Sequence, residues 1–149
     1  QDLRLPRTLV LVDFSHSKFK NTTLRPVLEL FTSSGSEASG LKVNMGYIEP
    51  KDNTFINAYK GLTQTNCLSN ISEVNWSGNH LSPDLFKFFQ TQKQLKFISL
   101  MDLDIQKQGP FFQMFTQVVK LSGFKGLEIG SDSFEPEVVI PFILSLKDR

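Results

Sequence analysis

The sequence predicts an α/β solenoid of about five strand–helix repeats, with a parallel sheet on the concave side and helices on the convex side. Three observations support this prediction. An eleven-residue apolar pattern recurs along the chain, a stretch with helical apolar spacing follows each copy, and the strand segments are short and half-polar. We therefore expect residues 1–149 to form one domain and to be a fragment of a longer array.

The clearest copy of the pattern spans Ile71–Leu81. It has apolar residues at positions one, four, six and eleven and Asn79 at position nine, where its side chain can satisfy backbone groups of the turn that leaves the strand. The second copy would pack weakly at positions one and nine, because the small residues Ala38 and Gly46 stand there. The other copies place these residues at the same five offsets: Leu9, Val12, Phe14, Ser17 and Phe19; Ala38, Leu41, Val43, Gly46 and Ile48; Leu95, Ile98, Leu100, Leu103 and Ile105; and Phe124, Leu127, Ile129, Asp132 and Phe134.

Each copy is followed by a predicted helix with one apolar stripe that faces the strands. The third of these helices begins with Ser82 as N-cap and Pro83 at the first helical position, and the fifth begins at Glu135-Pro136. The third helix is predicted over residues 82–89, where one of the adjacent Phe88 and Phe89 can be buried while the other is only partly covered. The stripes of the other four helices are Leu24, Val27, Leu28 and Phe31; Phe55, Ala58, Tyr59 and Leu62; Phe111, Phe112, Phe115, Val118 and Val119; and Val138, Val139, Phe142 and Ile143.

A doubly wound α/β domain also alternates strands and helices and is the main structural alternative. Its buried parallel strands should be nearly continuous runs of Val, Ile and Leu, whereas the strand segments of this chain are half-polar. The recurring position of Asn79, with Asp132 and Ser17 as weaker equivalents, also favours a repeat. We therefore expect the solenoid, with Trp76 at an inward-facing repeat position in its core.

These segments resemble leucine-rich repeats of the long, ribonuclease-inhibitor-like class, over nearly the whole chain. The resemblance implies a leucine-rich-repeat solenoid, or horseshoe, that binds proteins. Residues 69–87 are also similar to repeats of the CARMIL family of actin capping-protein regulators, whose members add a membrane-binding domain and a capping-protein-binding segment to such an array. This similarity implies a role in actin-cytoskeleton or membrane-cortex regulation. Tropomodulin, another actin-linked protein with a short array of such repeats, is the second relative to which the resemblance extends.

Composition excludes several classes of partner. Sixteen Lys and Arg against fifteen Asp and Glu leave a net charge of +1, so no basic field is available to bind nucleic acid. No apolar run is long enough for direct membrane insertion.

The single cysteine, Cys67, suits a reducing cytoplasmic environment. The N-x-S/T motifs at Asn21, Asn70 and Asn75 would be glycosylated only if the chain were secreted.

No residue pattern indicates an enzyme, a cofactor or a metal site. His16 and His80 lack metal-ligand spacing, and Cys67 has no basic neighbour in sequence that would lower its pKa. Asp13 and His16 flank Ser15 too closely to form a catalytic triad, because residues two apart on a strand share a face and their neighbour points away. We therefore expect a non-catalytic protein.

The concave sheet face is the predicted binding surface, because solenoids expose their non-repeat strand positions there. Phe97, Met101 and Met45 are expected to be exposed among mixed polar groups, which suits a protein partner. The alternative is a structural solenoid segment that sets domain spacing or mediates self-association, for example as a homodimer. The predicted partner-binding residues are Asp13, Ser15, Lys42, Asn44, Glu73, Asn75, Ser77, Phe97, Ser99, Met101, Asp102 and Glu128.

Overall fold

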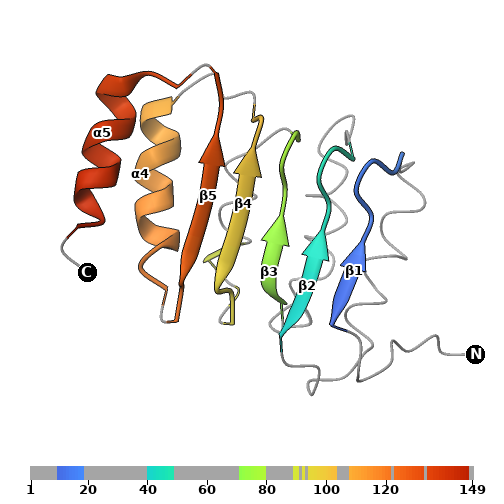
Figure 1. The fold of residues 1–149 in the computed structure, drawn as a ribbon. Coiled ribbons are helices and arrows are strands. Elements are labelled where there is room, and N and C mark those ends of the chain that lie inside the picture. Colours follow the sequence, from blue (N-terminus) through green and yellow to red (C-terminus); the bar gives the residue numbers. More distant parts are fainter. Residues whose placement is uncertain are drawn as a thin grey trace, which may run out of the picture.

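The fold is α/β, with one parallel sheet and two helices in the described part of the chain (Figure 1). A computed structural model describes residues 10–18, 40–48, 71–79, 89–90, 92, 94–103, 108–121, 123–132 and 134–147. The elements are β1 (Leu11–Asp13), β2 (Leu41–Asn44), β3 (Ile71–Asn75), β4 (Phe97–Met101), α4 (Gln108–Val118), β5 (Gly126–Gly130) and α5 (Pro136–Ser145).

The five strands lie side by side in the order of the sequence, β1-β2-β3-β4-β5, and every neighbouring pair is parallel. A doubly wound sheet reverses its strand order at a switch point, and the described strands contain no such reversal. In Figure 1 all five arrows point the same way, and α4 and α5 lie at the β5 end of the sheet.

The strand register corrects the predicted second copy. Val43, and not Leu41, pairs with Val12 on one side and with Val74 on the other. Leu41 pairs with Ile71 across a register shift between Leu41 and Lys42, so both apolar residues of β2 are buried. The corrected register also moves Met45 from the predicted binding face into the core, where it is 3% exposed.

Inward-facing residues of the central strands form the core together with α4. Val43, Val74 and Ile98 occupy the fourth repeat position, and Trp76 and Leu100 the sixth; all five are buried, which confirms the core position of Trp76. Burial of such side chains stabilises the fold by roughly 1.5–3 kcal/mol each. The same core cluster includes the predicted fourth stripe on α4, of which Phe111, Phe112, Phe115 and Val118 are buried and Val119 is half-buried.

Helix α5 extends the aromatic part of this core. Phe142 is buried, and its ring centroid lies 5.0 Å from that of Phe112 and 6.5 Å from that of Phe115. The helix begins as predicted, with Glu135 as N-cap and Pro136 in its first turn. Ile143 was expected in the buried stripe, but it is 57% exposed because α5 packs on α4 through Phe142. The predicted helices over residues 24–31 and 55–62 lie outside the described residues, as does that over 82–89 apart from the buried Phe89.

A left-handed turn follows four of the strands at the same repeat position. His16, Tyr47 and Asp102 have φ values of 58°, 56° and 55°, and the equivalent residue after β3 is Gly78, with φ 67°. Asn79, buried beside this turn, accepts a hydrogen bond from the Ile48 amide at 2.9 Å and donates to the carbonyls of Met45 and Trp76 at 2.6 and 3.1 Å. This confirms that its side chain satisfies backbone groups where the strands end.

Candidate protein-interaction face

One face of the sheet points away from the core, and we call it the open face. It consists of the third, fifth and seventh repeat positions, which alternate with the inward-facing residues along each strand. Neither α4 nor α5 packs on it, because both helices join the core cluster on the other side. The residues of the open face are Leu11, Asp13 and Ser15; Lys42, Asn44 and Gly46; Glu73, Asn75 and Ser77; Phe97, Ser99 and Met101; and Gly126, Glu128 and Gly130.

The register places all the predicted partner-binding residues on the open face except Asp102, which lies in the turn beyond β4. Their accessibility differs from the expectation. Ser77 and Ser99 are only 4% and 7% exposed, and their hydroxyls lie 3.2 Å apart. Phe97 and Met101, expected to be exposed, are half-buried.

A polar row at the fifth repeat position crosses the open face from β1 to β5. At one end, the Asn44 amide donates to the Asp13 carboxylate at 3.0 Å. At the other end, the Ser99 hydroxyl donates to Oε2 of Glu128 at 2.6 Å and lies 3.2 Å from the Ser77 hydroxyl. The Ser77 hydroxyl also accepts a hydrogen bond from the Met101 amide at 3.0 Å. These bonds orient the polar side chains of neighbouring strands relative to one another.

The same row closes a local turn at the end of three strands. Side-chain oxygens of Asp13, Asn44 and Asn75 each accept a hydrogen bond from the backbone amide two residues on, at 2.8, 3.1 and 2.9 Å. Hydrogen bonds from Ser15 are the main reason that the pKa of Asp13 is lowered, and Asn44 and His16 add smaller contributions in the same direction. The Asp13 side chain therefore has a structural role in the turn.

Two large side chains of β4 lean toward β5, where that strand carries a glycine. A Cβ atom on Gly126 would lie 2.6 Å from the Phe97 ring, and one on Gly130 would lie 2.4 Å from Cε of Met101. In the left-handed turn that follows β3, a Cβ atom on Gly78 would lie 2.1 Å from the Tyr47 ring. Each glycine thus makes room for a side chain of the preceding strand, which explains why Phe97 and Met101 are half-buried.

A shallow depression of about 240 Å³ lies on the open face. Charged groups border it: Lys42 forms an ion pair with Glu73 at 2.9 Å, and Glu128 lies on the β5 side. Because Phe97 leans over Gly126 and thus toward β5, its ring leaves the space above β3 open. The residues that line the depression come from all five strands: Leu11, Lys42, Val43, Asn44, Glu73, Val74, Asn75, Phe97, Ser99 and Glu128.

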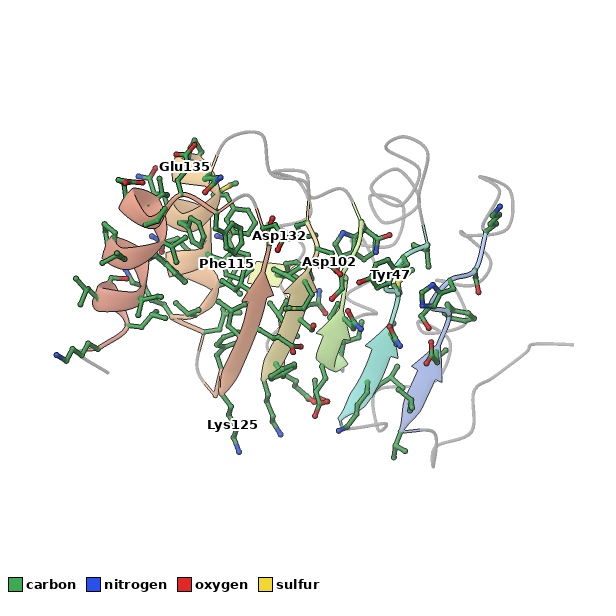
Figure 2. The ribbon with its side chains drawn as sticks, turned by 45° about the horizontal axis from the view of Figure 1, so that its top comes forward. Tyr47, Asp102, Phe115, Lys125, Asp132 and Glu135 are labelled. Carbon is green, nitrogen blue, oxygen red and sulfur yellow. The ribbon has the colours of Figure 1, made fainter. Side chains whose placement is uncertain are left out.

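A row of turn residues borders the open face at the carboxyl ends of the strands, and sequence analysis missed its central member, Tyr47. The Tyr47 ring stacks on His16 with ring centroids 5.0 Å apart. The Tyr47 hydroxyl donates a hydrogen bond to the carboxylate of Asp102, and Figure 2 labels both residues. This hydrogen bond is the main cause that raises the pKa of Tyr47. The corrected register was the missing signal, since it aligns Tyr47 with His16, Gly78 and Asp102.

The described residues do not assemble a recognisable reaction centre. No group of three His, Cys, Asp or Glu residues among them could hold a metal ion. The Asp13 carboxylate is bonded to the backbone amide of Ser15, while the His16 ring stacks on Tyr47. Cys67 and His80 lie outside the described residues. Neither described helix is long and apolar enough to cross a membrane.

Comparisons with known proteins identify no family for this chain. No protein-family model matches it, and neither the curated proteins nor the solved structures contain a significant match. The resemblance to leucine-rich repeats and to CARMIL repeats therefore stays a prediction from the residue pattern.

Proposed function

We propose that this protein is a non-catalytic protein–protein interaction scaffold that binds its partner on the open face. One observation carries the proposal: a depression on a sheet face that neither described helix covers, lined by side chains from all five strands. A partner seated there would contact every repeat in the sheet at once. Parallel strands in sequential order support a leucine-rich-repeat solenoid, in which this face would be the concave one.

The charge of this surface favours a protein partner with a basic contact region. Asp13, Glu73, Glu128 and the neighbouring Asp102 outnumber the single Lys of the open face, Lys42. A nucleic acid would be repelled by this balance, whereas basic side chains of a protein would be attracted and oriented by it. The proposed role in actin or membrane-cortex regulation is based on the resemblance of residues 69–87 to CARMIL repeats, and the proposed cytoplasmic location is based on the single cysteine.

Site-specific photo-crosslinking in cells tests the proposal. A photoreactive amino acid at Glu73, on the open face, should capture a discrete partner protein, which mass spectrometry then identifies. The same amino acid at Gln113, exposed on α4, is the matched control and should not capture that protein. Equal capture from both positions, or none from Glu73, would contradict binding on the open face.

Self-association is the second candidate, and the exposed side of α5 favours it. Ile140, Ile143 and Leu144 are 53%, 57% and 57% exposed and fall on one side of the helix. End-to-end pairing of β5 with β1 of a second copy, in the register of the sheet, would however place Glu128 opposite Asp13, and like charges directly opposite destabilise a sheet. A dimer would therefore use α5 rather than the sheet edges.

Light scattering coupled to size-exclusion chromatography decides between the two candidates. The scaffold proposal predicts a monomer whose mass is unchanged in the Ile143→Asp variant. Self-association through α5 predicts a dimer that this substitution converts to a monomer.

A further inference from the structure

We propose that the depression on the open face receives an arginine side chain of the partner protein, with Phe97 as the stacking platform and Glu128 as the carboxylate that pairs with the guanidinium. This inference deepens the proposed function and rests on it, since it names the chemistry of the contact. Shape, charge and unused hydrogen-bonding groups each support it.

The shape of the depression depends on a glycine outside its lining. The Phe97 ring occupies the place where any other residue at position 126 would put its Cβ, 2.6 Å away, so the ring leans toward β5. A bulkier residue there would push the ring back toward β3, across the opening between Glu73 and Glu128. We assign Gly126 as a positioning residue that keeps the depression open.

The charges that border the depression leave one carboxylate uncompensated. Lys42 is paired with Glu73 at 2.9 Å, while Glu128 has no cationic partner among the described residues. Ser99 donates to Oε2 of Glu128, and Oε1 accepts no hydrogen bond from the part of the chain that the structure describes. A cation is therefore the charged group that complements this site.

Arginine fits this arrangement better than lysine. Its planar guanidinium can stack on the face of Phe97 while its N–H groups reach a carboxylate, whereas an ammonium offers no planar face. Asn75 adds a second contact, because its oxygen accepts from the Ser77 amide while its NH2 group has no acceptor among the described residues. That NH2 group is available to a backbone carbonyl beside the partner's arginine.

A nuclear magnetic resonance titration tests this contact without knowledge of the partner. The probe is the N-acetyl, N′-methylamide derivative of arginine, with the lysine and norleucine derivatives as comparisons. We expect the arginine derivative to shift the backbone amide signals of Asn75, Ser99 and Glu128, and to bind several-fold tighter than the other two. Equal shifts from the norleucine derivative, or no shifts from the arginine derivative, would overturn the inference.

Three variants assign the contact to its residues. Glu128→Gln keeps a hydrogen-bond acceptor for Ser99 but removes the charge, and should weaken arginine binding at least tenfold. Gly126→Ala should do the same by moving the Phe97 ring, and Phe97→Leu tests the platform directly should Gly126→Ala fail to fold. Glu137→Gln, on the exposed side of α5, is the matched control and should change the affinity less than twofold. Unchanged binding by Glu128→Gln would overturn the inference.

The crosslinked partner separates failure of this inference from failure of the proposed function. If Glu73→Lys abolishes partner binding while Glu128→Gln and Phe97→Leu leave it intact, the open face binds a protein but not through an arginine in the depression. If no partner is captured from the open face, the proposed function itself fails.

Discussion

At the residue scale, the buried Asn79 side chain connects the turns that follow β2 and β3. Among the described residues it bonds backbone groups of Met45, Ile48 and Trp76, and the first two belong to the segment that follows the neighbouring strand β2. The residue therefore links neighbouring repeats as well as closing its own turn.

Replacing Asn79 by Ala should lower the free energy of unfolding by about 2–4 kcal/mol, because it leaves buried donors and acceptors without partners. Urea unfolding followed by circular dichroism measures the loss. Gln113→Ala, on the exposed side of α4, should change stability by less than about 0.5 kcal/mol. An equally small effect at Asn79 would show that these hydrogen bonds add little to stability.

Asp13 and Tyr47 make stability depend on pH at opposite ends of the scale. The lowered pKa of Asp13 means that its contribution is present above its ordinary value of 3.8 and disappears as the pH falls through the folded-state value. The raised pKa of Tyr47 means that its contribution is present below 10.0 and is lost as the pH rises beyond that point. The free energy of unfolding, measured across pH, should decrease less at acidic pH in Asp13→Asn and less at alkaline pH in Tyr47→Phe than in the wild type. The same pH dependence as the wild type in both variants would contradict these assignments.

At the element scale, α4 contributes three buried aromatic side chains to the core of the described residues. Phe111, Phe112 and Phe115 contact one another or Phe142 at centroid distances of 5.0–6.5 Å. Because Phe115 is fully buried, Phe115→Ala should lower the free energy of unfolding by about 3–5 kcal/mol. Thermal unfolding against the Gln113→Ala control tests this, and a loss below about 1 kcal/mol would mean that the cluster is loosely packed.

The exposed side of α5 should tolerate charge. Ile143→Asp removes an apolar side chain that is 57% exposed, so stability should change by no more than about 0.5 kcal/mol. Chemical unfolding of this variant measures the change. A loss of several kcal/mol would show that Ile143 is buried in the folded protein, as the sequence pattern had predicted.

The elements that the sequence predicted well are those with one unambiguous apolar pattern. The stripe of α4 and the strand of Ile71–Asn75 each admit a single register. In β2, Leu41 and Val43 alternate with polar residues, so either could occupy the fourth repeat position, and only pairing with Val12 and Val74 decides between them. The roles of Tyr47 and Gly126 depend on which residue lies opposite on the neighbouring strand, and such pairings become visible only once the register is known.

At the scale of the whole molecule, strands in sequential order bring five short segments, far apart in the chain, onto one surface. No single repeat contains a site. The depression exists because each strand contributes one or a few side chains to it, and because β5 carries a glycine opposite Phe97. The proposed binding therefore requires the whole sheet rather than any one strand.

The most direct test of the open face as the binding surface is the affinity of the crosslinked partner for two charge-reversal variants. Glu73→Lys changes the open face, and Glu137→Lys makes the same change on α5. Isothermal titration calorimetry should show binding at least tenfold weaker for Glu73→Lys and less than twofold weaker for Glu137→Lys. Equal losses in the two variants, or a loss confined to Glu137→Lys, would contradict binding on the open face.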